Sequence, residues 1–234
     1  MRKLLIVSGC SFTTDDFISI QYPQLDASWQ KWPAILAEKL DMDLLNMGKS
    51  GSGNEYIFNS LAEQIVDGKR EIGMAIAAWS QAQRRDWMMR TYREPRWTSS
   101  HLDMKGDVLY FLNKSLRYFY LFELLCKTNN IPYKHFSMIP LIEDFITEQE
   151  KRNMSSLKFT QKEVVEYIAK NPYYNKIDKN HFIGWPITEY LGGASLQKIV
   201  TNLHHPVSLQ ISRNDPHPNA KGHEMYAKFI HENL

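Results

Sequence analysis

Short apolar runs alternate with helical patterns over the first 80 residues of the chain. Residues 3–8, 43–47 and 72–79 are short, mainly apolar runs, which predict strands buried on both faces of a sheet. Between these runs, apolar side chains recur every three or four positions over 29–41 and 54–66, which predicts two helices. Strands that alternate with helices in this way form parallel sheets with crossover helices packed against them.

Residues that favour helix ends support these boundaries. Ser28 stands where an N-cap is expected, Pro33 fits only the first turn of a helix, and Gly68 ends the second helical pattern. A long helical pattern over about 107–127 and a fourth apolar run over 131–139 continue the alternation. The sequence therefore predicts a three-layer α/β/α sandwich with a mainly parallel central sheet, and ligands of such sheets bind at the carboxyl ends of the strands.

Two segments interrupt this regular pattern. Residues 141–212 are richer in Lys, Asn, Tyr and Pro and hold helical patches, such as 157–169, between loops. We interpret them as an inserted cap, and a final amphipathic helix follows over 221–232. We expect a single domain over residues 1–234, with insertions at about 82–106 and 141–212.

Composition and charge narrow the function classes. The chain has 28 Lys and Arg against 26 Asp and Glu, a formal charge of +2, which argues against a protein dedicated to nucleic acids or membrane surfaces. The first apolar run is shorter than a signal peptide requires, and no run approaches the roughly 20 apolar residues of a membrane span. Cys10 and Cys126 lie far apart and suggest no disulfide framework. We expect a soluble, cytoplasmic protein.

A serine follows the first predicted strand directly. Ser11 comes after Gly9 and Cys10, at the end of a buried strand where an α/β sheet displays a nucleophile on a tight turn. The alternative is that Ser11 only caps this turn.

A histidine and a carboxylate lie close together before the final helix. His217 stands between Pro216 and Pro218, which stiffen its backbone, and Asp215 precedes it by two positions. A carboxylate so placed can hold an imidazole in one tautomer while the second ring nitrogen takes a proton from a serine. The alternative is a polar turn, with Asn219 as the N-cap of the final helix and His217 merely exposed.

Taken together, these blocks resemble the SGNH (GDSL-like) hydrolases, a family of serine esterases with a flavodoxin-like sandwich. GCSFT resembles the first family block, NMGKSGSGN at 46–54 the second and NDPHPNAKGH the last, in the expected order. The resemblance covers about the first 80 and the last 25 residues. It implies that Ser11 is the nucleophile, that Gly51 belongs to the oxyanion hole and that His217 is the general base.

The chain departs from the family pattern at two points. The third block, Gly-x-Asn-Asp, is replaced by AAWSQAQRRDW, in which Gln81 takes the Asn position and Ser80 is the next candidate. The family also sets Asp three residues before His, where this chain has Asn214. We take Asp215 as the orienting acid.

The resemblance implies a serine esterase or acylhydrolase that cleaves a small acyl ester, such as O-acetyl on a carbohydrate. The oxyanion would be met by the backbone N–H groups of Ser11 and Gly51 and by an amide such as that of Gln81. No metal or cofactor is required. The alternative is a weak or inactive domain of this fold that binds a glycan or a protein partner, which the missing third block favours.

Three other patterns suggest different chemistry. GKS at 48–50 would be part of a phosphate loop only with a Gly at position 43, where this chain has Asp43. His204 and His205 lack metal-ligand spacing. An arginine-rich segment could contact an anionic polymer, or its arginine stems could simply cover aromatic rings, and it could shape what the neighbouring site accepts. Its members are Arg84, Arg85, Arg90, Arg93 and Arg96, with Trp87, Tyr92 and Trp97.

Overall fold

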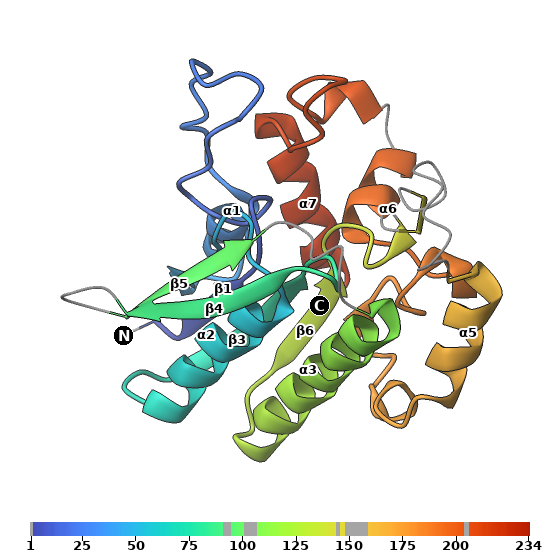
Figure 1. Cartoon of the computed structure of the whole chain (residues 1–234). Helices are drawn as coiled ribbons and strands as arrows, with labels where there is room; N and C mark the ends of the chain where they lie inside the picture. The colour runs from blue at the N-terminus through green and yellow to red at the C-terminus, as the bar shows by residue number, and fades with distance from the viewer. Residues whose placement is uncertain (1, 91–94, 101–106, 144–145, 148–158, 204–205) are drawn as a thin grey trace.

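The core of the protein is a five-stranded sheet in which every strand pair is parallel (Figure 1). The computed structural model describes residues 2–90, 95–100, 107–143, 146–147, 159–203 and 206–234. This architecture confirms the predicted parallel sheet. In spatial order the strands are β2 (Asp43–Asn46), β1 (Leu4–Ser8), β3 (Ile72–Trp79), β6 (Tyr133–Ser137) and β7 (Phe182–Ile183).

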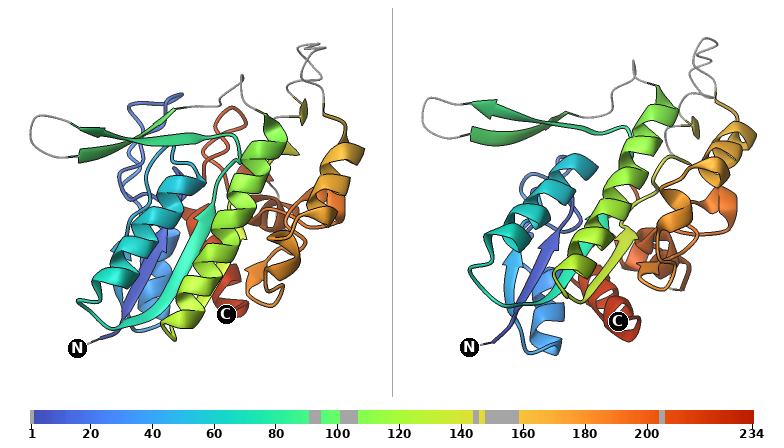
Figure 2. Two further views of the ribbon diagram at one scale, coloured as in Figure 1. Left: turned by 60° about the horizontal axis from the view of Figure 1, so that its bottom comes forward. Right: turned by 90° about the horizontal axis from the view of Figure 1, so that it is seen from below.

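Helices cover both faces of this sheet, as the alternation predicted (Figure 2). Successive side chains of a strand point to opposite faces, so Leu4 and Ile6 of β1 enter one core while Leu5 and Val7 enter the other. The first core includes residues of α2 (Asn54–Asp67), α3 (Val108–Thr128) and α5 (Gln161–Lys170). The second includes residues of α1 (Trp32–Lys39), α6 (Leu196–Leu203) and α7 (Ala220–Glu232). Short 3₁₀ helices lie at Tyr174–Lys176, Glu189–Leu191 and Pro206–Ser208.

Helix α1 is shorter than its apolar pattern predicts, and Ser28 is not its N-cap. The helix begins at Trp32, and the N-cap position, Lys31, makes no side-chain cap. A helix that began at Trp29 would place Pro33 where its N–H should bond the Trp29 carbonyl, and proline has no N–H. That carbonyl instead accepts from the Lys31 ammonium at 3.1 Å. The proline therefore fixes where α1 can start.

The segment after β3 forms an antiparallel hairpin that extends away from the sandwich (Figure 2). Its strands are β4 (Arg85–Arg90) and β5 (Pro95–Ser100), which make a separate two-stranded sheet. Asp86 at its base is buried and accepts the backbone N–H groups of Gly53 and Tyr56, at 2.8 and 2.9 Å. Because Gly53 offers no side chain to cap α2, Asp86 supplies that cap from the hairpin. The base of the hairpin is thereby fixed beside the start of α2.

The segment 141–212 also contributes to the sheet, through β7, which pairs with β6. Strand β7 has only two residues, which is too short to give a strand pattern in the sequence, and no strand was predicted there. Tyr92 and Arg93 of the arginine-rich segment and the pair His204 and His205 lie outside the described residues. None of the described helices is long and apolar enough to cross a membrane.

Candidate active site

Ser11 lies in the turn that follows β1, at the carboxyl edge of the sheet. The backbone N–H groups of Thr13 and Thr14 both donate to the carbonyl of Cys10, at 2.8 and 3.1 Å, and close this turn. A side chain at Gly9 would place its Cβ 2.3 Å from Thr13 Oγ1, so the turn can pack only around glycine. Strand β1 lies between β2 and β3, so a strand flanks the turn of Ser11 on each side.

Three side chains at this edge form a continuous chain of hydrogen bonds. Ser11 Oγ lies 2.8 Å from His217 Nε2, although the two residues are 206 positions apart. His217 Nδ1 lies 2.6 Å from Asp215 Oδ1. An ionised carboxylate only accepts hydrogen bonds, so Nδ1 carries the proton and Nε2 is left to accept from the serine hydroxyl. This is the arrangement that removes a proton from a serine.

The loop before α7 holds the histidine in place. The backbone N–H of His217 donates to Asp215 Oδ1 at 3.1 Å. This bond forms a tight turn between the two residues, which lie two positions apart. Asn219 caps α7 by accepting from the N–H of Gly222 at 3.0 Å, and its amide donates to the carbonyls of Ser208 and Gln210. The rings of Phe12 and Phe17 pack against the imidazole, with centroids 4.7 and 4.4 Å away.

Burial and charge set the protonation states of the pair. Burial lowers the pKa of His217 against the opposing effect of Asp215, and the positive charge of Arg84 lowers it further. Burial tends to raise the pKa of Asp215, but hydrogen bonds from Ser19 and His217 outweigh it and leave that pKa below its usual value. At neutral pH the imidazole is therefore neutral and the carboxylate ionised, as a general base and its orienting acid must be.

These protonation states give an expected pH profile. Only the neutral imidazole accepts the serine proton, so kcat/KM should fall as acid protonates His217 and should stay level through neutral pH. Because the pKa of His217 lies below its ordinary value of 6.5, the midpoint of the acid limb should lie below 6.5. Initial rates with a neutral aryl ester between pH 4 and 8 measure this. A midpoint at 7 or above would contradict the assignment of the base.

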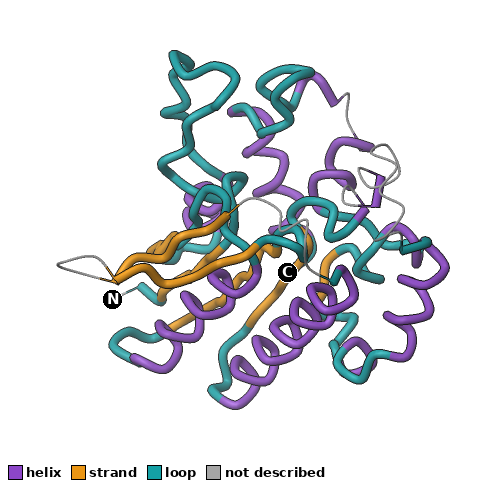
Figure 3. Tube along the Cα trace, viewed as in Figure 1, coloured by secondary structure: helices purple, strands orange, loops and turns teal. Residues whose placement is uncertain are grey.

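A fourth residue, Ser19, supports the carboxylate. Its hydroxyl donates to Asp215 Oδ2 at 2.5 Å and accepts from the N–H of Tyr22 at 3.0 Å, and the side chain is buried. Ser19 lies in the long loop between β1 and α1, which meets the loop before α7 on one side of the sandwich (Figure 3). The sequence gives no local signal for this role, because Ser19 is a serine in a polar loop 196 positions from its partner.

Removing this hydroxyl should weaken the site without destroying it. A hydrogen bond to a charged group contributes about 1.5 kcal/mol or more, so Ser19→Ala should lower kcat about 10-fold and raise the pKa of Asp215. Ser19→Thr keeps the hydroxyl and should restore most of the rate. Steady-state kinetics of the two variants provide the measurement, and equal rates for Ser19→Ala and the unaltered protein would show that the contact has no catalytic value.

A pocket of about 380 Å³ opens beside the serine. Ser11, His217 and Asp215 line it together with Gly51, Ser50 and Asn214, and Phe17, Ile18 and Ile20 form an apolar wall. Gly51 has φ 79°, a left-handed conformation that glycine adopts without strain. The loop around Gly51 is bound to the nucleophile turn, because the Lys49 N–H and the Ser52 hydroxyl both donate to the Gly9 carbonyl at 2.9 Å.

Gln81 and Ser80 do not line this pocket, whereas Arg84 does. The side-chain oxygen of Gln81 accepts from Arg84 Nε at 3.1 Å. Ser80 is buried, and its backbone N–H donates to the Asn54 amide oxygen at 2.8 Å. The structure thus brings together four of the five predicted site residues, and the guanidinium-bearing Arg84 lines the pocket that Gln81 does not line.

A second histidine and carboxylate pair lies inside the core. His135 and Glu123 are fully buried, with His135 Nε2 3.0 Å from Glu123 Oε1. The indole N–H of Trp79 donates to His135 Nδ1 at 3.1 Å. Both ring nitrogens are therefore used in structural contacts, and His135 has none left for a serine or a substrate.

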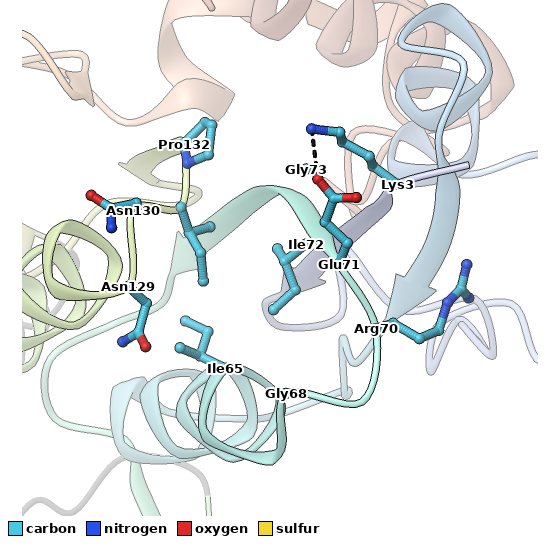
Figure 4. Close-up of a pocket in the computed structure, with 11 residues that line it drawn as sticks. Lys3, Ile65, Gly68, Arg70, Glu71, Ile72, Gly73, Asn129, Asn130 and Pro132 are labelled. Atoms are coloured by element: carbon cyan, nitrogen blue, oxygen red, sulfur yellow. Dashed lines mark ion pairs between the residues drawn. The ribbon is translucent and has the colours of Figure 1, made fainter. Parts of the chain in front are cut away.

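A larger cavity, of about 450 Å³, lies at the opposite edge of the sheet (Figure 4). Its lining includes Lys3 and Glu71, which form an ion pair at 2.7 Å, and residues 129–132 just before β6. These positions precede the strands, whereas ligands of parallel sheets bind beyond the carboxyl ends. Within the described residues, no cluster of three or more His, Cys, Asp or Glu could hold a metal ion.

Comparison with known proteins identifies the fold. No family model and no curated protein matches the sequence. A structure assigned to the lipolytic G-D-S-L family, from Desulfitobacterium hafniense, is 14% identical, with a TM-score of 0.51 over 99% of both chains. A protein from Slackia heliotrinireducens that is assigned to the SGNH hydrolases is 10% identical, with a TM-score of 0.51 over 100% of this chain and 99% of that one. The chain has the fold of the SGNH hydrolases, as its sequence blocks indicated.

Proposed function

We propose that this protein is a serine esterase or acylhydrolase that cleaves a small acyl ester through Ser11, His217 and Asp215. The observation that carries the proposal is the hydrogen-bond chain from Ser11 Oγ through the imidazole to Asp215. This chain of hydrogen bonds connects residues from near the two ends of the sequence. Its three members line a pocket at the carboxyl edge of the sheet, where ligands of parallel sheets bind. If Ser11 only capped its turn, or if His217 were merely exposed, the two side chains would have no reason to bond each other beside a pocket.

The geometry supports acyl transfer in two steps. Ser11 Oγ attacks the ester carbonyl carbon while His217 Nε2 takes its proton, and Asp215 stabilises the imidazolium that forms. The C–O bond of the ester then breaks, the imidazolium protonates the departing alcohol, and an acyl-enzyme remains. Water attacks this intermediate with the imidazole again as base, which releases the acid and returns the proton to Ser11.

The negative charge on the tetrahedral oxygen needs hydrogen-bond donors. We assign this role to the backbone N–H groups of Ser11 and Gly51. The two residues lie in neighbouring loops that are hydrogen-bonded to each other and line the same pocket. The amide of Gln81, the expected third donor, is directed with its oxygen toward Arg84. One such donor stabilises the transition state by about 3 to 4 kcal/mol. Without a third donor at the Gln81 position, the site should therefore reach a lower kcat.

An acetyl group on a carbohydrate is our proposed substrate class. A pocket of about 380 Å³ accommodates a short acyl group with part of its alcohol. With 4-nitrophenyl esters from acetate to octanoate, kcat/KM should be highest for the shortest chains, and acetylated oligosaccharides should release acetate. Rates that rise with chain length would contradict the small-acyl proposal.

The second candidate is a weak or inactive domain that binds a glycan or a protein partner. The observation that favours it is the absence of the third-block asparagine, together with the position of Gln81 away from the pocket lining. A folded protein that neither hydrolyses short-chain esters nor reacts with a phosphonate would contradict the esterase proposal and favour this candidate.

A further inference from the structure

Arg84 is held rigidly in the wall of the candidate active site. Its Nε donates to the side-chain oxygen of Gln81 at 3.1 Å, and its Nη1 donates to the carbonyl of Ser52 at 3.3 Å. Gly53 packs so closely that a Cβ there would lie 2.9 Å from the Arg84 carbonyl. The guanidinium is therefore fixed between the loop of Gly51 and the end of β3, and it lines the same pocket as Ser11.

The charge of this guanidinium is not neutralised by the neighbouring acids. The nearest acid along the chain, Asp86, uses both oxygens to cap α2. Asp215 uses one oxygen for His217 and the other for Ser19. Among the described residues, Arg84 forms no ion pair, and the two bonds above use two of its five N–H donors. Three donors and a full positive charge are left.

The rest of the described pocket lining offers this guanidinium no anion that is not already bonded to another group. Phe17, Ile18 and Ile20 face it with apolar side chains, and Ile18 and Ile20 are 72% and 84% exposed. Asp215, the only acid in the described lining, is 3% exposed and lies behind the imidazole. A ligand in this pocket therefore meets both a fixed cation and apolar side chains.

We propose that the natural substrate is an ester that carries a carboxylate, which Arg84 binds while Ser11 attacks the ester carbonyl. The inference rests on the proposed function and adds the charge of the substrate to it. A guanidinium matches the planar carboxylate and forms charge-assisted bonds to it that are about twice as strong as neutral ones. The charged group is the specificity determinant, and the apolar wall holds the remainder of the substrate.

Paired substrates that differ only in charge test this inference. One pair places the charge on the alcohol: 5-acetoxy-2-nitrobenzoate against 5-acetoxy-2-nitrobenzamide. The other places it on the acyl group: the 4-nitrophenyl half-ester of succinate against 4-nitrophenyl butanoate. In at least one pair, kcat/KM of the unaltered protein should be about 10-fold higher for the carboxylate, because a charge-assisted bond typically gives this factor.

Substitution of Arg84 should remove this preference selectively. Arg84→Gln should lower kcat/KM for the carboxylate about 10-fold more than it lowers kcat/KM for the neutral ester, and the difference should lie mainly in KM. Arg84→Lys keeps the charge and should retain part of the preference. The matched control is Arg213→Gln, which removes an equal charge one residue from Asn214 without altering the pocket wall.

The outcomes separate this inference from the esterase proposal. Equal kcat/KM within both pairs, with active protein, overturns the inference and leaves the esterase function standing. An equal loss of kcat on charged and neutral esters in Arg84→Gln also overturns it, because that result makes Arg84 an oxyanion donor. No turnover of any ester and no reaction with a phosphonate overturns both. Reaction of Arg84→Gln with a neutral phosphonate at the unaltered rate shows that its Ser11 site is intact.

Discussion

Replacement of Ser11 by alanine should lower kcat for a short-chain ester by about 10⁶-fold. In the proposed mechanism this hydroxyl is the atom that bonds to the acyl carbon, and it lies 2.8 Å from His217 Nε2, the proposed base. The fold should be unaffected, because the change removes one oxygen from a half-buried side chain in a turn closed by backbone hydrogen bonds. Initial rates at saturating ester, with circular dichroism as a check on folding, provide the measurement.

A histidine variant and a surface serine complete this test. His217→Ala should cost about as much as Ser11→Ala, and the double variant little more than either, because the two groups act as one unit. Ser28→Ala removes an exposed hydroxyl from the loop before α1 and should leave the rate unchanged. Activity that survives Ser11→Ala while depending on His217 would assign the nucleophile to water and overturn the acyl-enzyme mechanism.

The second large effect is expected for Asp215→Asn, which should lower kcat by about 10⁴-fold. The carboxylate accepts from His217 at one oxygen and from Ser19 at the other. An amide has only one oxygen, and if Ser19 keeps it, the NH₂ group faces the imidazole. The imidazole then carries its proton on Nε2, and this tautomer cannot accept the hydrogen bond from the Ser11 hydroxyl. Steady-state rates of the purified variant measure the loss.

A neighbouring asparagine serves as the comparison for this variant. Asn214 stands three positions before His217, where the family has its acid, but its side chain is exposed and the imidazole pairs with Asp215. Asn214→Ala should therefore change kcat by less than about 3-fold. A loss with Asn214→Ala that equals the loss with Asp215→Asn would move the orienting role to the asparagine.

Local patterns predicted the sheet because its strands are short, continuous and flanked by strong helical signals. The two-residue strand β7 lies below the length at which such a pattern can be seen, and the hairpin β4–β5 lies in a segment of mixed charge and aromatic residues. Pro33 shows how a single residue can decide a boundary, because α1 begins at Trp32, about one turn later than its apolar pattern.

The candidate site was predictable where its residues lie next to strand ends or the final helix. Ser11, Gly51 and His217 occupy such positions, and the resemblance supplied their order. Ser19 and Arg84 have no comparable signal, since their roles depend on contacts with Asp215 and with Ser52 across the fold. Gln81 matched the family position by count along the chain, but its side chain turns to Arg84, which sequence spacing cannot reveal.

The most direct test of the central claim is covalent labelling of the unaltered protein with a fluorophosphonate, followed by peptide mapping with mass spectrometry. A phosphonate reacts with a serine only where a neighbouring base activates it, so the label reports the Ser11 and His217 pair without any assumption about substrate. We expect one phosphonate per chain, on Ser11, and none on His217→Ala. Labelling at another residue, or none in the folded protein, would contradict the assignment of Ser11 as an activated nucleophile.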